Sequence, residues 1–73
     1  MSGFNMVKNS INVQDQFLNQ VRREKETVIV ELMSGIQLEG LVKSFDNFCI
    51  LFDSDRTYLI YKHAVSNVSI PTP

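Results

Sequence analysis

The first regular pattern of apolar residues in the chain predicts an amphipathic helix. Between Asn12 and Lys25 the apolar positions have the spacing of one helix face: Val13, Phe17, Leu18 and Val21. Asn12 is a favourable N-cap, and Asp15 places negative charge in the first turn, where the helix dipole favours it. The dipole also favours the basic residues at the other end: Arg22, Arg23 and Lys25. We therefore expect a helix from Asn12, with its apolar stripe packed on the rest of the protein.

After Lys25 the pattern changes to that of strands. Residues 27–33 are rich in β-branched side chains, and the alternate positions expected on one face are apolar: Val28, Val30 and Leu32. Ser34 and Gly35 form a turn signal, because glycine allows a positive φ angle. These features predict a strand followed by a tight turn.

The next strand, residues 36–45, alternates again. Its inward-pointing residues are expected to be Ile36, Leu38 and Val42, and its outward-pointing residues Gln37, Glu39 and Lys43. Gly40 lies inside this strand, where a glycine usually marks a sharp bend or a bulge. We expect such a feature at Gly40, as a small barrel needs at its corners.

Three more strands complete the predicted fold. The short connection Asp46-Asn47 leads into residues 48–52, a polar turn separates these from residues 57–61, and Pro71 stops a last strand over residues 65–70. The predicted fold is mainly β, with an N-terminal α-helix followed by five short antiparallel strands that form a strongly bent sheet or a partly open barrel. We expect one domain over residues 12–70, with a flexible tail at 1–11 and a short tail at 71–73.

Two of these strands are apolar at consecutive positions instead of alternating. Residues 48–52 read Phe-Cys-Ile-Leu-Phe, and residues 58–61 read Tyr-Leu-Ile-Tyr. Such runs are typical of strands that are covered on both faces, and one small barrel cannot cover both faces of each strand. We therefore expect these strands, or their free edges, to meet another subunit.

Composition adds limits to this picture. A chain of 73 residues buries only about 60% of its unfolded surface, so self-association is a natural source of further stability. The single cysteine, Cys49, has no partner for an internal disulfide or for a shared metal, so it is expected to be a small buried hydrophobe. No metal site and no cofactor are predicted.

No targeting or membrane segment is visible. The chain has no run of roughly 20 apolar residues, which is the length needed to span a bilayer. Residues 1–10 lack the charged and apolar blocks of a signal peptide. We expect a soluble cytoplasmic protein.

Three segments of the chain resemble the bacterial Hfq family of Sm-like proteins. Residues 14–24 are similar to the N-terminal helix of that family, and residues 28–46 are similar to the first Sm motif. The run Tyr61-Lys62-His63-Ala64, preceded by Leu59-Ile60, resembles the Hfq version of the second Sm motif and is the most specific of the three. The resemblance covers roughly residues 12–69 without an evident gap.

The resemblance implies an Sm fold assembled as a ring of six identical subunits, in which the last two strands of neighbouring subunits pair. It implies an RNA chaperone that regulates gene expression after transcription, binding small regulatory RNAs and messenger RNAs and helping them to anneal. It implies neither an enzyme nor a small-molecule substrate, and His63 has no evident nucleophile beside it.

Carried onto this chain, the resemblance implies a uridine-rich RNA site at the pore, here called the proximal set: Gln14, Asn47, Phe48, Tyr61, Lys62 and His63. Phe48 would stack on a base, Asn47 and Gln14 would bind base edges, and Lys62 and His63 would meet phosphates or a terminal hydroxyl. Tyr61 is expected to be mainly structural, with its ring filling a subunit interface. Without the resemblance, Phe48 reads equally well as a core residue.

A second implied surface, here called the rim set, lies at the end of the helix: Asn19, Arg22, Arg23 and Lys25. Arginine binds phosphates in forked geometry and stacks on bases, although a solvated helix end would have the same composition. The formal net charge of −1 argues against RNA binding, which is usually driven by basic surfaces. A ring would concentrate copies of Lys62 around one pore and so remove most of this objection.

The third implied surface, here called the distal set, departs from the family pattern. Its matching residues are Gly35, Ile36 and Leu38, with Tyr58 as a possible substitute ring. Glu31 stands where a purine-stacking aromatic is usual, and Glu39 stands where glutamine or a basic residue is usual. A glutamate cannot stack and repels phosphate, so weak adenine-rich binding is expected here.

Two alternatives stay open at this stage. An Sm-like ring that only protects uridine-rich ends would need the proximal set but not Arg22 and Arg23. An SH3-like module that binds proteins would share the fold, because a fold alone does not imply RNA. Such a module should carry an aromatic groove for proline-rich peptides, and the chain has no tryptophan.

Overall fold

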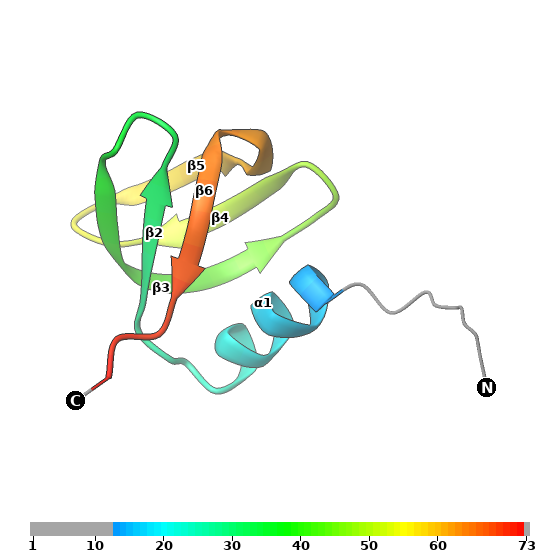
Figure 1. The fold of residues 1–73 in the computed structure, drawn as a ribbon. Coiled ribbons are helices and arrows are strands. Elements are labelled where there is room, and N and C mark those ends of the chain that lie inside the picture. Colours follow the sequence, from blue (N-terminus) through cyan, green and yellow to red (C-terminus); the bar gives the residue numbers. More distant parts are fainter. Residues whose placement is uncertain (1–12, 73) are drawn as a thin grey trace.

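The computed structural model describes residues 13–72 as one helix and a bent sheet (Figure 1). The predicted N-cap Asn12, the predicted tail 1–11 and the last residue, Pro73, lie outside the described residues. The elements in chain order are α1 Val13–Arg23, β2 Val28–Leu32, β3 Gln37–Phe45, β4 Cys49–Asp53, β5 Thr57–Tyr61, the 3₁₀ turn η1 Lys62–Ala64 and β6 Val65–Ser69. Within residues 13–72, no helix has the length and apolar character needed to cross a membrane.

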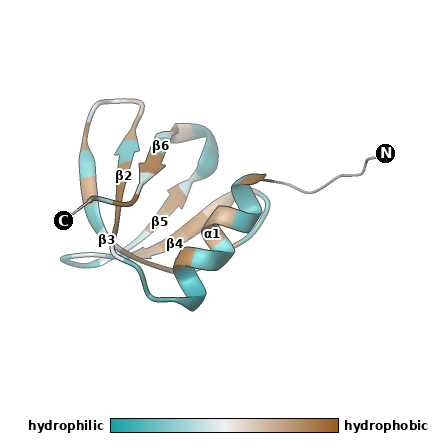
Figure 2. Cartoon of the chain, turned by 60° about the horizontal axis from the view of Figure 1, so that its bottom comes forward, coloured by the Kyte–Doolittle hydropathy of each residue, from teal (hydrophilic) through white to brown (hydrophobic). Residues whose placement is uncertain are grey.

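The amphipathic helix is confirmed, and it packs against β3. Leu18 and Val21 are buried and Phe17 packs beside them, whereas Val13 is exposed at the first position. Figure 2 shows the hydrophilic colour along the outer side of α1 and the hydrophobic colour where the helix meets the sheet. The helix lies on the sheet by its apolar stripe, as the spacing predicts.

The sheet is antiparallel throughout, in the order β5-β4-β3-β2-β6. Strand β3 joins its two halves, since Gly40 pairs with Val28 of β2 and the next residue, Leu41, pairs with Asp53 of β4. The bend predicted at Gly40 is therefore present. A Cβ atom at Gly40 would lie 2.1 Å from the carbonyl oxygen of Asp53, so only glycine allows this approach.

The bulge in β3 lies three residues beyond this bend. Val42 pairs with Phe52 and Ser44 pairs with Leu51, which leaves Lys43 as the extra residue of the strand. A bulge adds twist and changes the direction of the side chains around it. The bend at Gly40 and the bulge at Lys43 together turn one long strand through both halves of the sheet.

Helix and sheet enclose one apolar core with no buried polar side chain among the described residues. Its members are Leu18, Val21, Val28, Val30, Val42, Ile50, Phe52 and Ile60. Leu32 and Leu38 pack against it as predicted, but the inward orientation predicted for Ile36 is wrong, since its side chain is 57% exposed. Ile36 lies in the β2–β3 turn ahead of the strand, where neither α1 nor the facing strands cover it.

Among residues 13–72, the two consecutive apolar runs are covered on one face only. Ile50, Phe52 and Ile60 point into the core. Leu51 and Leu59 pair with each other across β4 and β5 and point the other way, and Leu59 is 60% exposed. Cys49 is half-buried. The second face of these strands is therefore apolar and open to a partner.

Candidate nucleic-acid interface

The β3–β4 turn holds Phe48 in a fixed position outside the core. The Asp46 carboxylate accepts hydrogen bonds from the backbone N–H groups of Phe48 and Cys49, each at 2.8 Å. β4 begins at Cys49 and not at Phe48 as predicted, and Phe48 belongs to the turn that these two hydrogen bonds close. The Phe48 side chain is 73% exposed. An aromatic ring is thus presented to solvent on a well-ordered turn.

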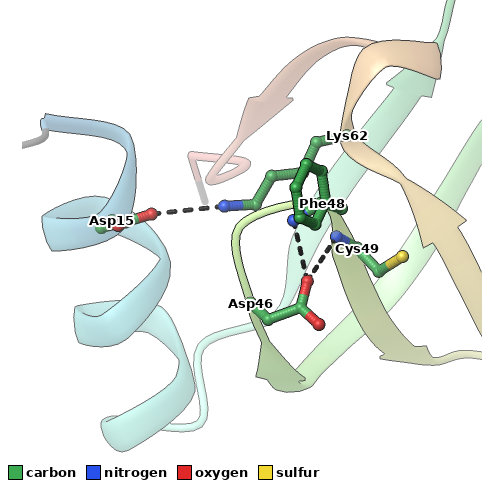
Figure 3. A network of polar contacts seen from close by, with 5 residues as sticks. All are labelled: Asp15, Asp46, Phe48, Cys49 and Lys62. Carbon is green, nitrogen blue, oxygen red and sulfur yellow. Dashed lines mark hydrogen bonds and ion pairs between the residues drawn. The ribbon is translucent and has the colours of Figure 1, made fainter.

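The second part of the site is the 3₁₀ turn that follows β5. The backbone N–H of Lys62 donates to the Phe48 carbonyl at 2.7 Å, which joins the two turns. The Lys62 side chain runs from there toward α1, where its Nζ lies 3.3 Å from Asp15 Oδ1 (Figure 3). The same Nζ lies 5.3 Å from the centre of the Phe45 ring. Only 11% of this side chain is exposed, and the Asp15 carboxylate partly neutralises its charge.

Five of the six residues of the proximal set line one hollow of about 340 Å³, here called the proximal hollow: Gln14, Asn47, Phe48, Lys62 and His63. They come from α1, the β3–β4 turn and η1, which are far apart in the sequence. Tyr61 does not line this hollow. It lies on β5 opposite Cys49, with its ring centre 5.9 Å from that of His63.

The chemical character of the proximal hollow is mixed. It offers an open aromatic face, two side-chain amides, an imidazole and a partly shielded ammonium group. A flat ring accepts a base by stacking, and amides and imidazole exchange hydrogen bonds with base edges and phosphates. Within residues 13–72, no group of three or more His, Cys, Asp or Glu side chains is placed to hold a metal ion.

Asp46 makes the stability of the Phe48 turn dependent on pH. The N–H groups of Phe48 and Cys49 hold the pKa of Asp46 below its usual value of 3.8. A carboxyl group whose pKa is lower in the folded than in the unfolded chain stabilises the fold at pH values above its unfolded-state pKa. This stabilisation is lost as the pH falls through its folded-state pKa.

We expect Asp46→Asn to lower the urea midpoint at neutral pH, because asparagine keeps the acceptor oxygen but lacks the charge. The difference from the unmodified protein should shrink as the pH is taken below 3.8. Urea unfolding of both proteins across this range measures it. A difference that stays constant at every pH would contradict the role of the carboxylate.

The residues of the rim set lie at the C-terminal end of α1 and just beyond it. An Arg22 guanidinium N–H donates to Asn19 Oδ1, while Arg23 is exposed. Lys25 has φ 54°, and the chain ends the helix with two backbone hydrogen bonds, Glu26 N–H to Val21 O and Lys25 N–H to Arg22 O. This is the Schellman arrangement, in which the position of Lys25 usually holds glycine.

The residues of the distal set come from the β2–β3 turn, β3 and β5. Gly35, with φ 94°, and Ile36 form the β2–β3 turn, and Leu38 packs against the core. Glu31 accepts a hydrogen bond from Gln37 Nε2 at 3.2 Å. The Tyr58 hydroxyl donates to Asp55, and the Arg56 guanidinium lies 5.9 Å from the centre of its ring, so Tyr58 is already engaged locally.

Two residues of the interface were not predicted from the sequence. Asp15 was assigned only to the helix dipole, yet it pairs with Lys62, 47 residues further along the chain. Asp46 was assigned to a turn, which is correct, but its two bonds to the Phe48 turn need the folded geometry. For Asp46 the sequence does carry a signal: it stands two positions before Phe48, a spacing at which an Asp side chain often bonds the backbone of its own turn.

Comparison with known proteins places the chain among relatives of one family. The Hfq protein family matches residues 13–73. The chain is 62% identical over 61 residues to the RNA-binding protein Hfq of Anoxybacillus flavithermus, with 82% of each chain covered. It is 57% identical over 65 residues to the RNA-binding protein Hfq of Ruminiclostridium cellulolyticum, covering 88% of this chain and 81% of that relative.

A solved structure gives the same result for the fold. A crystal structure of the pleiotropic translational regulator Hfq matches with a TM-score of 0.79 and 30% identity, covering 81% of this chain and 100% of the other. The predicted Sm-like architecture, a helix followed by a bent five-stranded antiparallel sheet, is thereby confirmed. The matched segment contains α1, all five strands and both turns of the proximal hollow. The chain belongs to the Hfq family.

Proposed function

We propose that the protein is an RNA chaperone that acts after transcription, as a ring of six copies. It holds uridine-rich RNA in the proximal hollow and promotes annealing of small RNAs to messenger RNAs through the rim set. The observation that carries this proposal is the meeting of Gln14, Asn47, Phe48, Lys62 and His63 around one hollow. The relatives are named for RNA binding, and the family is one of RNA-binding proteins and not of enzymes.

Stacking on Phe48 is the main source of affinity in this proposal. Stacking of a base on an aromatic ring contributes ~1–3 kcal/mol and tolerates any base. Preference for uridine then comes from the side-chain amides of Asn47 and Gln14, which match the donors and acceptors of its edge. Because Asp15 partly neutralises Lys62, phosphate attraction is weaker here than at an unpaired lysine. The net charge of −1 is compatible with a site that depends on bases more than on the backbone.

Ring assembly is supported by the two edges of the sheet. β5 and β6 are its terminal strands, so each has one side without a strand partner among the described residues. Exposed apolar side chains accompany them, including Leu59, Tyr61 and Ile70. Pairing of β5 in one copy with β6 in the next is a head-to-tail contact, the type that forms a ring when the rotation between copies closes. The solution mass should then be about six times 8.4 kDa, and a monomer mass would contradict the ring.

Cross-linking tests the location of the RNA. A short oligouridine carrying photoreactive 4-thiouridine should attach to the β3–β4 turn or to η1, and peptide mapping by mass spectrometry identifies the position. The Phe48→Ala variant should lose the cross-link at the turn. Cross-links confined to β2 or to the β2–β3 turn would place the RNA on another face and overturn the proximal site.

The distal face should bind adenine-rich RNA weakly. Glu31 offers a carboxylate where a stacking ring would be needed, and it already bonds Gln37. We expect Glu31→Tyr to strengthen oligoadenine binding by about tenfold, since it adds a ring that stacks and removes a charge that repels phosphate. Fluorescence titration measures this, with Glu31→Gln as the control that removes the charge without adding a ring. Tight oligoadenine binding by the unmodified protein would contradict the prediction.

A further inference from the structure

An apolar groove lies between α1 and the last strand of the sheet. It is a hollow of about 280 Å³, here called the α1–β6 groove, and most of its lining side chains are apolar: Val13, Phe17, Leu18, Ile50, Val65 and Val68. We propose that this groove is the docking site of the chain's own residues 4–11. The proposal goes beyond the proposed function, because docking of this segment requires no RNA.

The floor of the groove is the protein's own core. Leu18 and Ile50 are buried core residues, whereas Phe17, Val65 and Val68 pack against the core but stay half-buried at the walls. Removing apolar surface from water is favourable in proportion to the area covered. A further apolar segment laid in the groove would therefore complete the cover that α1 gives to the core.

The segment before α1 has the composition that such a groove favours. Residues 4–11 contain four apolar side chains, Phe4, Met6, Val7 and Ile11, and a single charge, on Lys8. The volume of the groove lies just below the range of about 300–1,000 Å³ typical of small-molecule pockets, so it suits a few side chains. In an extended backbone, side chains two positions apart point to the same side. The pair at positions 4 and 6 is therefore the expected anchor.

The segment is attached to the protein at the groove itself. Val13, the first residue of α1, is one of the lining residues, and its side chain is 75% exposed. Phe4 lies nine positions before Val13, and nine extended residues span up to about 30 Å. The 11-residue helix is only about 16 Å long, so the segment is long enough to run back beside it.

This attachment favours the segment over a separate partner. Docking within one chain has an effective concentration in the millimolar range for a short flexible link, which a second copy or another protein does not reach at ordinary concentrations. The segment also meets no uncompensated charge in the groove, since the charge of Lys62 is paired with Asp15. Gln14 and Ser66, the other polar lining residues, carry donors and acceptors that suit a peptide backbone.

Docking would place the segment beside the proximal hollow. Gln14 and Lys62 line both the α1–β6 groove and the proximal hollow. A segment that packs in the groove therefore contacts two of the side chains that the proposed function assigns to RNA. It would form one border of that site.

Photo-cross-linking of the full-length chain tests the proposal without RNA. Phe4 is replaced by the photoreactive amino acid p-benzoylphenylalanine, which keeps the aromatic ring, and peptide mapping by mass spectrometry locates the attachment. We expect attachment to α1 or β6, at Phe17, Val65 or Val68. The same probe in place of Ile36, an exposed apolar residue of the β2–β3 turn, is the control and should not attach to the groove.

Assemblies prepared from a mixture of isotope-labelled and unlabelled protein show whether the attachment joins one copy or two. Attachment within one copy supports the proposal. Attachment mainly between copies would overturn it, because the groove would then hold a second copy. Attachment mainly to the β2–β3 or β4–β5 turn, or to no site, would overturn it as well.

Loss of the anchor should also destabilise the fold. The double variant Phe4→Ser with Met6→Ser is expected to lower the thermal midpoint by about 4–8 °C, because it removes two side chains that cover the core. The matched control, Met33→Ser with Ile36→Ser, changes two exposed apolar side chains and should shift the midpoint by no more than about 2 °C. An unchanged midpoint in the first variant would overturn the docking of these side chains.

The docking proposal and the proposed function fail separately. The cross-link and the thermal midpoint are measured without RNA, so a negative result in both leaves the proximal hollow as proposed. A failure of the unmodified protein to bind oligouridine would overturn the proposed function and would leave the docking of residues 4–11 as measured.

Discussion

Replacement of both Phe48 and Lys62 by alanine is expected to weaken oligouridine binding by roughly tenfold or more. Phe48 supplies the stacking face, and loss of one base stack alone costs ~1–3 kcal/mol. Lys62 supplies the one cation of the proximal hollow. Equilibrium titration with a labelled oligouridine, at constant salt, measures the combined loss.

The double variant should keep its fold and its assembly. Neither Phe48 nor Lys62 belongs to the apolar core. Replacement of Lys62 removes its ion pair with Asp15 and its contact with the Phe45 ring, so a lower unfolding midpoint is expected without loss of the fold. A matched control is Met33→Ala with Arg56→Ala, which also removes one exposed apolar side chain and one cation, neither of which lines the proximal hollow. The control should bind oligouridine as the unmodified protein does. Unchanged affinity in the Phe48 and Lys62 variant, with the solution mass preserved, would rule out the proximal assignment.

Gly40→Ala should have the largest effect on stability, a loss of about 3 kcal/mol or more. The added Cβ would lie 2.1 Å from the Asp53 carbonyl oxygen and 3.0 Å from the Ser54 Cα. These are backbone atoms, so they cannot move aside without separating β3 from β4. Urea unfolding monitored by circular dichroism measures the loss.

Gly35→Ala provides the comparison for that result. Gly35 has φ 94°, so alanine there is strained, but a Cβ would meet nothing within 4 Å. The expected cost is about 1 kcal/mol, from backbone conformation alone. If Gly40→Ala cost no more than Gly35→Ala, the close approach of β3 to Asp53 would not constrain the fold as inferred.

Most of the fold could be predicted from periodicity because each element buries one face. The spacing of Leu18 and Val21 in α1, and of Val28 and Val30 in β2, is the pattern that burial produces. Prediction fails where a residue leaves the regular pattern. Phe48 is continuous with an apolar strand in sequence, but in the structure it lies in the turn that the Asp46 carboxylate closes, and β4 begins one residue later.

The bulge shows a second kind of limit. Gly40 is visible in the sequence as a break in β3, and the bend occurs there. The bulge at Lys43 carries no such mark, because its position depends on how Val42 and Ser44 pair with a strand formed by later residues. Register between strands is decided by both partners, so the pattern of one strand does not define it.

The sequence indicates which residues gather around the proximal hollow but not their electrostatics. The match to a family motif identified Lys62 and His63, and the fold brings them to Phe48 and Asn47. The pairing of Lys62 with Asp15 joins residues 47 positions apart, which no local pattern records. This pairing changes the expectation for the site, since a partly neutralised lysine leaves more of the affinity to stacking and hydrogen bonds.

The central proposal is that the proximal hollow selects uridine-rich RNA through its bases. The most direct measurement is a titration of the unmodified protein with labelled oligouridine and oligoadenine of equal length, at two salt concentrations. We predict tighter binding of oligouridine at both concentrations, with a modest loss at higher salt and a steeper loss for oligoadenine. Equal affinities that fall together with salt would contradict the proposal, because they would show attraction to phosphate without recognition of the bases.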